Sequence, residues 1–419
     1  MDIPEENPEL RDEKNKLIKY GLYQVQGHKN SMQDFVLSSI KLNNKKYPRI
    51  YAVFGLFDGH GGEEVSHYLS VHFLEYLEKS IEFLGKKEII KDSKEIRKVI
   101  KPTFLDLDKS LMTDSAKEEL VSYSKNEIID EDQEREDIKN FCSDEKFNDD
   151  ELDKIMEFNQ IFNPRNIENI NIAEYSGSSG MIILFSDDRI YIASVGNSRC
   201  LLFDKEGNYI ESTRIHTMKE KDEKKRVDII RTFNKEIKKS KSKGSGIDQY
   251  IDCTRGFGDW ELKQNPWIGQ EEQEISVDPD IFEKNINDIG YIIFGSNGMF
   301  DRDEINDNII KNIGNELICK IIGTKGRYSE TLKEYFKNVL DKAKEDKKKL
   351  DNISCFAIKI YHQEFEVLKE NNIKSKNEEL EILKEEEKNK NKNKNDKIQK
   401  NIIDNDEKYV EGDNIINDN

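Results

Sequence analysis

Asp58 ends an apolar run at residues 50–57 and is followed by Gly59, His60 and two more glycines. A carboxylate beside a bare main-chain carbonyl is a donor set suited to a hard divalent cation. Glycines in such a turn let a ligand approach the main chain closely. The alternative is a strand-to-helix turn in which Asp58 caps the helix expected from residue 63. This short stretch alone does not decide between a metal site and a capped turn.

Three other strand ends also carry an acid or an amide. The first, QGHKNSMQDF, holds Lys29, Gln33 and Asp34. The second, IIFGSNGMFD, holds Asn297 and Asp301, and the third, KKLDNISCFAIKI, holds Asp351 and Asn352. Carboxylates that converge from separate strand ends are what a two-metal site for hard cations requires. The spacing therefore favours a metal site assembled from distant parts of the chain.

Apolar segments bounded by turn residues must position these side chains. Their composition predicts strands at 21–27, 47–57, 179–196, 198–210, 288–296 and 352–361, with hairpin turns inside the two middle stretches. Helical spacing predicts helices at 63–83, 92–111, 304–323 and 328–347. Because adjacent strands are joined by short turns and do not alternate strictly with helices, we expect antiparallel sheets.

Seven motifs occur together in one order along the chain. They read QGHKNSMQD, FDGHGG, SGSSGMIILF, ASVGNSRCLLF, TRGFGDWELK, FGSNGMFD and DNISCFAI. This set resembles the metal-dependent protein phosphatases of type 2C, the PPM family, over residues 17–361. The resemblance implies an α+β fold, a four-layer α/β/β/α sandwich of two mainly antiparallel sheets packed face to face with helices outside. It also implies hydrolysis of phosphoserine and phosphothreonine in phosphoprotein substrates with two Mg²⁺ or Mn²⁺ ions per site.

Four residues of this sequence match the centre of the family's site. By resemblance, Asp58 is the ligand that bridges the two metals, and the carbonyl of Gly59 binds the second metal. Asp351 is similar to a ligand of the first metal. His60 matches the proposed general acid for the leaving alcohol, a role suited to histidine near neutral pH. The alternative for His60 is a cap of the helix that follows it.

The remaining positions depart from the family pattern. Asn297 stands where the family has an Asp ligand, Gln33 replaces one acid of an acidic pair whose second member is Asp34, and Lys29 replaces the phosphate-binding Arg. Asn197 likewise removes the Asp associated with a third metal. Each amide can still coordinate a cation but adds no charge, and Lys lacks the bidentate fork of Arg. With Asp301 retained, these changes indicate a folded homologue with weakened metal binding, a pseudophosphatase.

Two motifs carry no metal ligand in this interpretation. Asp259 in TRGFGDWELK and the glycines of SGSSG are expected to support core turns, so both stay outside the predicted site.

Changes in composition divide the chain. We expect a lead-in at 1–16, a phosphatase-like domain at 17–361 and a charged tail at 362–419 that is partly helical or disordered. The domain should carry an acidic insertion at about 113–172 and a basic loop at about 218–246. Both are expected to be solvated loops, and the alternative is that they dock oppositely charged partners or each other.

The net charge of −18 argues against a nucleic-acid partner, and no apolar run approaches the ~18 residues of a membrane span. Five scattered cysteines favour reduced thiols in an intracellular, cytoplasmic protein. Three functions stay open: an impaired phosphatase homologue used as a binding or scaffold module, an active Mn²⁺- or Mg²⁺-dependent serine/threonine phosphatase, and a structural component of a larger assembly. The sequence predicts no oligomeric state.

Overall fold

The structure is a computed structural model of the 419-residue chain. It describes residues 8–29, 31–124, 171–238, 253–300, 306–346 and 348–368. The chain divides into two units, Met1–Phe365 and Glu366–Asn419. In the second unit only 366–368 are described, so nearly all of the predicted tail, like the acidic stretch 126–154, lies outside the described residues.

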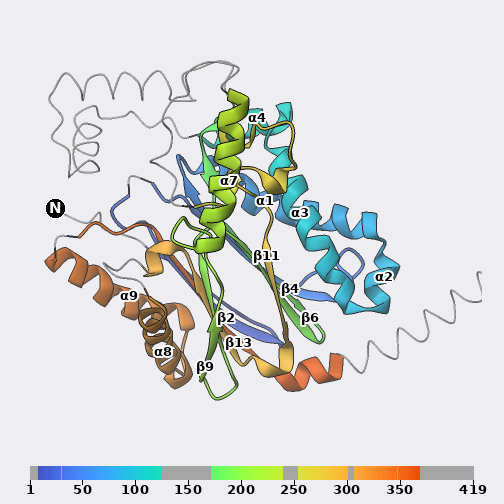
Figure 1. The fold of residues 1–419 in the computed structure, drawn as a ribbon. Coiled ribbons are helices and arrows are strands. Elements are labelled where there is room, and N and C mark those ends of the chain that lie inside the picture. Colours follow the sequence, from blue (N-terminus) through green and yellow to red (C-terminus); the bar gives the residue numbers. More distant parts are fainter. Residues whose placement is uncertain are drawn as a thin grey trace, which may run out of the picture. The chain divides into compact units, whose positions relative to one another are not determined.

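Two antiparallel sheets form the centre of the first unit (Figure 1). In the described residues, one sheet has the strand order β1 (Glu9–Lys14), β2 (Ile18–Val25), β13 (Ile353–Ile360), β12 (Tyr291–Gly295), β8 (Arg199–Phe203) and β9 (Tyr209–Ser212). The other has the order β10 (Phe257–Gly258), β5 (Gly177–Ser178), β4 (Ile50–His60), β6 (Gly180–Ser186), β7 (Arg189–Val195) and β11 (Asp280–Asn285), with β3 (Asp34–Ser39) beside β4. Each predicted strand segment overlaps at least one of these strands.

The two sheets pack face to face through aromatic side chains. Tyr20 on β2 meets Phe54 on β4 edge to face, with ring centroids 5.0 Å apart. Phe54 also meets Phe356 on β13 at 5.7 Å, and Phe294 on β12 stacks on Phe356 at 4.6 Å. Strands β4, β12 and β13 are buried along nearly their whole length. They therefore read in the sequence as continuous apolar runs rather than as alternating patterns.

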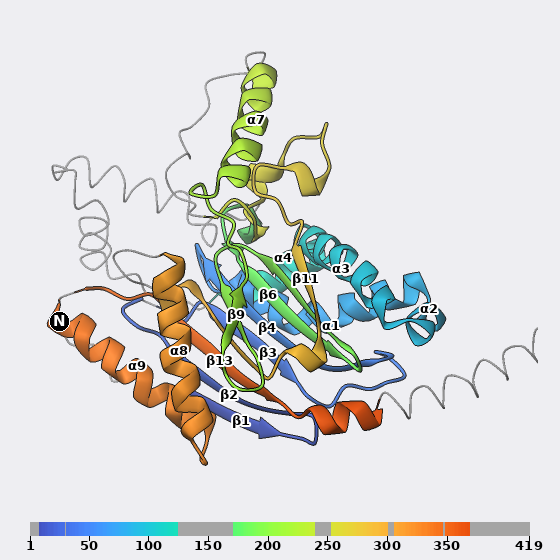
Figure 2. The ribbon, with the colours of Figure 1, turned by 60° about the horizontal axis from the view of Figure 1, so that its bottom comes forward.

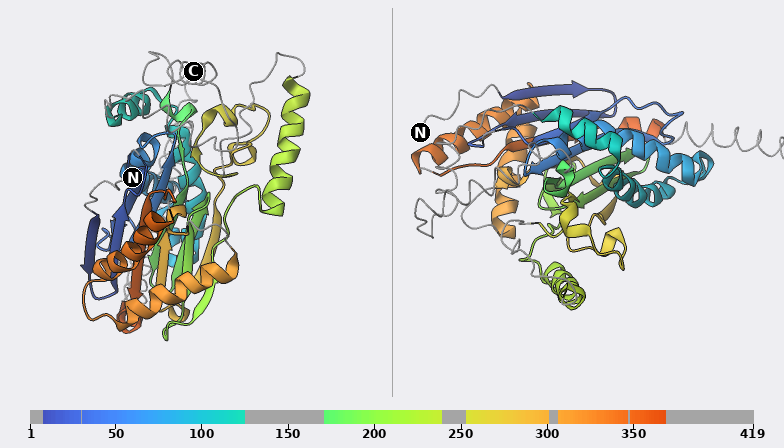
Figure 3. Two further views of the ribbon diagram at one scale, coloured as in Figure 1. Left: turned by 90° about the vertical axis from the view of Figure 1, so that its left-hand side faces the viewer. Right: turned by 90° about the horizontal axis from the view of Figure 1, so that it is seen from above.

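Helices cover the outer face of each sheet (Figures 2 and 3). The seven-stranded sheet packs beneath α1 (Glu64–Leu84), which in turn contacts α2 (Lys86–Lys91), α3 (Ile96–Ser110) and α4 (Asp114–Tyr123). The six-stranded sheet packs against α8 (Asp307–Gly323) and α9 (Tyr328–Glu345). The observed layers are helix, sheet, sheet and helix, so the predicted sandwich is confirmed.

The lead-in predicted at 1–16 is wrong for its second half. Residues 9–14 form β1, which pairs with β2 along its full length from Glu9–Gln24 to Lys14–Lys19. This strand lies at the sheet edge and buries little surface, so its sequence ELRDEK lacks the apolar residues that would reveal it.

The basic loop predicted at about 218–246 is also wrong where the structure describes it. Residues 221–238 form helix α7 (Lys221–Lys238), which projects from the sandwich in Figure 2. Val227 and Ile230 are buried on its inner face, whereas most of its other described residues are exposed. The few apolar residues of this stretch, of which Val227 and Ile230 are buried, were too weak a signal against the eleven basic residues of 218–243.

The predicted acidic insertion, about 113–172, begins in ordered structure. Helix α4 (Asp114–Tyr123) buries Ala116 and Leu120 in the core beneath α1. At the far end of the insertion, the amide of Asn171 donates to the carbonyl of Leu111 at 2.7 Å. Both ends of the insertion are therefore held by the domain.

Across the described residues, no helix is long and apolar enough to cross a membrane. The four cysteines in that part of the chain, Cys200, Cys253, Cys319 and Cys355, are not joined in disulfides.

Candidate active site

Asp34 and Asp58 lie opposite each other where β3 and β4 pair. Asp34 is 3 % exposed, and neither of its carboxylate oxygens accepts a hydrogen bond of normal geometry from a described residue. Burial raises the pKa of Asp34 to about 6, and the nearby hydroxyls of Ser354 and Ser296 only partly offset it. Burial, followed by the charges of Asp34 and Asp351, raises the pKa of Asp58 well above its ordinary value. A site with this much uncompensated negative charge favours a bound cation.

The second sheet brings amide and acid groups to the same place. Asn297 follows β12, and its main-chain N–H donates to Asp58 Oδ2 at 3.3 Å. The side-chain Oδ1 of Asn297 is buried and accepts no hydrogen bond from a described residue. Asp351 precedes β13, the neighbour of β12. Gly298 allows this close packing, because a Cβ there would lie 2.1 Å from the carbonyl oxygen of Asn352.

Asn352 connects the sheet ends that carry these groups. Its Oδ1 accepts from the N–H of Gln33 at 2.8 Å, and its Nδ2 donates to the carbonyls of Gln26 at 2.6 Å and Ser31 at 3.1 Å. The carbonyl of Gln33 in turn accepts from the N–H of Gly59 at 3.1 Å. The main chain of the Gln33 loop is thus fixed between the two sheets, beside Asp34.

The small residues after Asp58 are required by close contacts. A Cβ on Gly59 would lie 2.6 Å from Ser66 Oγ and 2.8 Å from the carbonyl oxygen of Gln33. Gly61 and Gly62 have φ of +69° and +134°, a region that favours glycine. Strand β4 continues through Asp58 to His60, three residues beyond the predicted strand, because Gly59 and His60 pair with β5.

Neither of the capping alternatives describes the turn after β4. Helix α1 begins at Glu64, and its N-cap residue Glu63 makes no side-chain capping hydrogen bond. Asp58 lies inside β4, and its Oδ2 accepts from Asn297. The imidazole of His60 contacts Asp259 rather than the helix.

Asp259, which is not among the residues predicted for the site, lies against His60. The Nε2 atom of His60 is 2.9 Å from Asp259 Oδ2 and 3.1 Å from Oδ1. Burial lowers the pKa of His60, but the charge and hydrogen bond of Asp259 outweigh it, and the net shift is upward. The signal that could have placed Asp259 in the site was its membership of TRGFGDWELK, one of the seven motifs.

Lys29 lies at the rim of the site. Its Nζ is 3.3 Å from Asp351 Oδ1, and the two side chains are 46 % and 29 % exposed. A partly exposed ammonium at this place can attract a phosphate group. This ammonium also lies against the carboxylate of Asp351, one of the predicted metal ligands.

Two further positions in the motifs are Asp301 and Asn197. Asp301 lies outside the described residues. Asn197 follows Gly196 in a turn between β7 and β8, where Gly196 N–H donates to His216 Nδ1 at 3.1 Å and Ser198 Oγ lies 3.0 Å from Ser179 Oγ.

The residues present fit a hard divalent cation only in part. Across the described residues, no group of three or more His, Cys, Asp or Glu side chains is close enough to hold a metal ion. Three buried oxygens, both of Asp34 and Oδ1 of Asn297, nevertheless lack hydrogen-bond partners among the described residues. Oxygen donors of this kind are the ligands that Mg²⁺ and Mn²⁺ prefer.

The fold and site together define a four-layer sandwich with acids and amides gathered at one end of two facing sheets. The family model described as "Protein phosphatase 2C" matches residues 18–124 and 116–304. The chain therefore belongs to the protein phosphatase 2C family, whose members depend on metal ions, generally Mg²⁺ or Mn²⁺, and act on phosphoproteins.

Curated relatives and solved structures agree with this membership. The chain is 25 % identical over 333 residues to "Probable protein phosphatase 2C 4" of Paramecium tetraurelia, covering 78 % of this chain and 88 % of the relative. It is 23 % identical over 318 residues to "Probable protein phosphatase 2C 21" of Oryza sativa subsp. japonica, covering 75 % and 78 %. The crystal structure of serine-threonine phosphatase 2C from Toxoplasma gondii aligns with a TM-score of 0.51 at 15 % identity, covering 85 % of this chain and 98 % of that one. This last likeness supports the fold.

Proposed function

We propose that this chain is a protein phosphatase 2C homologue with weakened metal binding and impaired catalysis, which acts as a binding or scaffold module for a phosphoprotein or other protein partner. The observation that carries the proposal is Asn297. Its main-chain N–H donates to Asp58 Oδ2 at 3.3 Å, and its neutral side-chain amide, with Oδ1 buried and without a partner among the described residues, stands where the family motif has a charged Asp ligand. The loss of an outer-shell partner costs about 10–100-fold in metal affinity or activity, and the loss of a charged ligand should cost at least as much.

The contact between Lys29 and Asp351 points the same way. An ammonium 3.3 Å from the Asp351 carboxylate competes with a metal ion for that ligand. In the family pattern an Arg at this position grips the phosphate with two parallel hydrogen bonds, which a Lys cannot form. The site therefore loses negative charge for the metals and geometric precision for the phosphate.

The residues have assignable roles in the chemistry that the family performs. Asp58, the Gly59 carbonyl, Asp351, Asn297, Asp34, Gln33 and Asp301 would hold two Mg²⁺ or Mn²⁺ ions. Such ions, when bound, lower the pKa of a water molecule so that it can attack phosphorus. Lys29 would orient the phosphate, and His60 would give a proton to the leaving alcohol.

A second candidate is an active, Mn²⁺-dependent serine/threonine phosphatase. It is favoured by the retained acids, since Asp34 and Asp58 face each other and the Asp351 charge acts on both. It is also favoured by the contact between His60 and Asp259.

Phosphate release separates the two candidates. The full chain is incubated with a phosphoserine peptide and Mn²⁺ beside the Asp58→Ala variant, and Mn²⁺ binding is titrated by calorimetry. Impaired catalysis predicts weak Mn²⁺ binding and a rate close to that of Asp58→Ala. A rate of about 1 s⁻¹ or more, within the ordinary enzyme range, that disappears in Asp58→Ala would favour the active phosphatase.

A further inference from the structure

We propose that Asp259 is the positioning residue of His60: it holds the imidazole by Nε2 and leaves Nδ1 as the nitrogen that can exchange a proton with a leaving group. The inference deepens the phosphoester chemistry proposed above and rests on it for the role of His60. A carboxylate only accepts hydrogen bonds, so the Nε2 that faces Asp259 carries the hydrogen. This fixes the tautomer of the ring as well as its direction.

The two side chains have very different environments. Asp259 is 4 % exposed, whereas the His60 side chain is 37 % exposed. Both oxygens of Asp259 lie within 3.1 Å of the single atom Nε2. The carboxylate is therefore the buried support, and the imidazole is the group that reaches the surface of the site.

The main chain at Asp259 is shaped for this contact. Asp259 has φ 51° and ψ 40°, the left-handed conformation, and follows Gly258 at φ +72°. A non-glycine residue in this conformation is uncommon and strained, so surrounding contacts must hold it. The same residue, Ser176, binds both partners: its carbonyl accepts from Asp259 N–H at 3.0 Å, and its Oγ donates to the carbonyl of His60 at 3.2 Å.

Gly177 leaves the space in which the pair meets. It lies directly opposite His60 in the pairing of β4 with β5. A Cβ on Gly177 would come within 2.3 Å of Asp259 Oδ2 and 2.6 Å of His60 Nε2. Any side chain at residue 177 would force the carboxylate and the imidazole apart, and this gives SGSSG a role that is tied to the site.

A buried ion pair fixes the main chain just before Asp259. Asp108 on α3 and Lys263 are both fully buried, with Lys263 Nζ 2.9 Å from Asp108 Oδ2. Asp108 Oδ1 accepts from the N–H of Gly258 at 2.8 Å, and Lys263 Nζ donates to the carbonyl of Gly256 at 2.9 Å. The pair thus holds the main chain on both sides of Phe257, directly before Asp259. Such a pair contributes little net stability, but the loss of one partner is costly.

The direct test is the tautomer of His60 in the full chain, labelled with ¹⁵N in its six histidines. The His60→Gln variant identifies the His60 signals. We expect hydrogen on Nε2 in the natural sequence and a shift to the Nδ1–H form in Asp259→Asn, whose amide can donate to Nε2. Gly177→Ala should also lose the Nε2–H preference without altering either side chain. Asp106→Asn, an exposed change on α3, is the matched control, and thermal unfolding checks that each variant is folded.

An unchanged His60 tautomer in folded Asp259→Asn would overturn the proposal. The tautomer of His60 can be measured without catalysis, so its result does not depend on the proposed function. If the natural sequence releases no phosphate while the tautomer shifts as expected, the catalytic role of the site fails and the positioning of His60 remains.

Where activity is measurable, the leaving group distinguishes positioning from general damage. A phosphoserine peptide needs a proton on its departing alcohol, whereas p-nitrophenyl phosphate releases a stable phenolate. Asp259→Asn should lower kcat on the peptide by at least about 10-fold, leaving its KM and the p-nitrophenyl phosphate rate within about twofold. Equal losses on both substrates would reduce Asp259 to a structural role.

Discussion

In the function proposed above, the amide of Asn297 stands where the family motif has an aspartate. The main-chain N–H of Asn297 makes the contact of this turn with Asp58, so the contact does not depend on the side chain. In that proposal the substitution changes the charge of the site, because an amide is neutral where an aspartate would be ionised. The motifs place Asp34, Asp58 and Asp351 at strand ends; in the structure Asp34 pairs with Asp58, and the charge of Asp351 acts on both.

The motifs predicted which segments gather, but not the individual hydrogen bonds between their side chains. The pairing of His60 with Asp259 depends on a left-handed turn and on the bare Cα of Gly177. Neither feature leaves a periodic pattern in the sequence. Asn352 likewise appeared beside Asp351 as one more amide, whereas in the structure it is the residue that joins two loops.

Asn352→Ala should destabilise the domain through its main-chain partners. The change removes three hydrogen bonds and leaves the N–H of Gln33 and the carbonyls of Gln26 and Ser31 without this partner. Because each buried polar group left unpaired costs about 1–3 kcal/mol, we expect the free energy of unfolding to fall by about 2–4 kcal/mol. Urea unfolding measures it, with exposed Asn308→Ala on α8 as the control. A loss under about 0.5 kcal/mol, typical of surface changes, would contradict this role for Asn352.

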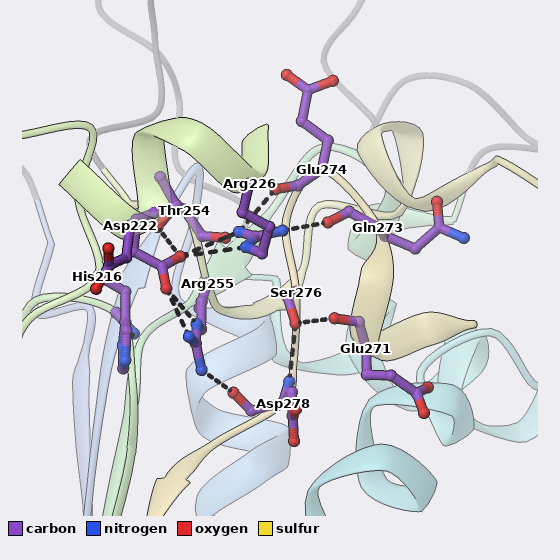
Figure 4. Close-up of polar contacts among 12 residues, drawn as sticks. His216, Asp222, Arg226, Thr254, Arg255, Glu271, Gln273, Glu274, Ser276 and Asp278 are labelled. Atoms are coloured by element: carbon purple, nitrogen blue, oxygen red, sulfur yellow. Dashed lines mark hydrogen bonds and ion pairs between the residues drawn. The ribbon is translucent and has the colours of Figure 1, made fainter. Parts of the chain in front are cut away.

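Helix α7 shows at the scale of an element what charge counting misses. Glu223 near its start is buried, and its carboxylate accepts from Thr254 Oγ1 at 2.7 Å and Arg255 Nε at 3.0 Å. Arg226, one turn later, donates to the carbonyls of Gln273 and Thr254 (Figure 4). A run of lysines and acids predicts a solvated loop. The sequence does not reveal which single acid is buried between two arginines.

Glu223→Gln should loosen this anchor in a pH-dependent way. Burial alone would raise the pKa of Glu223, but hydrogen bonds from Arg255 and Thr254 and the charges of Arg255 and Arg226 bring it to about 2, against 4.5 ordinarily. A lowered pKa in the folded state adds stability above pH 4.5 that is lost as the pH falls toward 2. The variant should therefore be less stable by about 3 kcal/mol at pH 7, and the difference should shrink at pH 3.

Unfolding by urea at the two pH values checks this, with Asp222→Asn, an exposed neighbour on α7, as the control. A difference between Glu223→Gln and the natural sequence that does not change with pH would rule out the ionised Glu223 as the anchor.

At the scale of the whole molecule, the sandwich was the most predictable feature. Strands buried between a helix layer and a second sheet are continuous apolar runs, and four of the five long helices in the described residues (α1, α3, α8 and α9) lie within a few residues of their predicted bounds. The edge strand β1 and the projecting helix α7 were missed because both bury little apolar surface. Sequence patterns report burial, so elements at the margin of a fold leave the weakest signal.

Deletion of 126–154 should leave the domain nearly as stable as before. The flanking segments are held independently, by Leu120 in the core and by the hydrogen bond from Asn171 to Leu111. We expect the unfolding midpoint to change by no more than about 2 °C, which for a domain of this size corresponds to about 1.4 kcal/mol. Any partner bound through this acidic stretch should be lost in a salt-dependent manner. Differential scanning calorimetry gives the midpoint, and a fall of about 10 °C would mean that the stretch belongs to the fold.

The most direct measurement of the central claim is the rate of phosphate release by the chain with acids introduced at Asn297 and Gln33. Asn297→Asp with Gln33→Glu returns two negative charges to the metal site, and the residues act as a unit, so either change alone should do little. With Mn²⁺ and a phosphoserine peptide, the double variant should exceed the natural sequence by about 10-fold or more, and Asp58→Ala in that background should abolish the gain. A folded double variant that is no faster than the natural sequence would contradict the claim that these two amides limit the site.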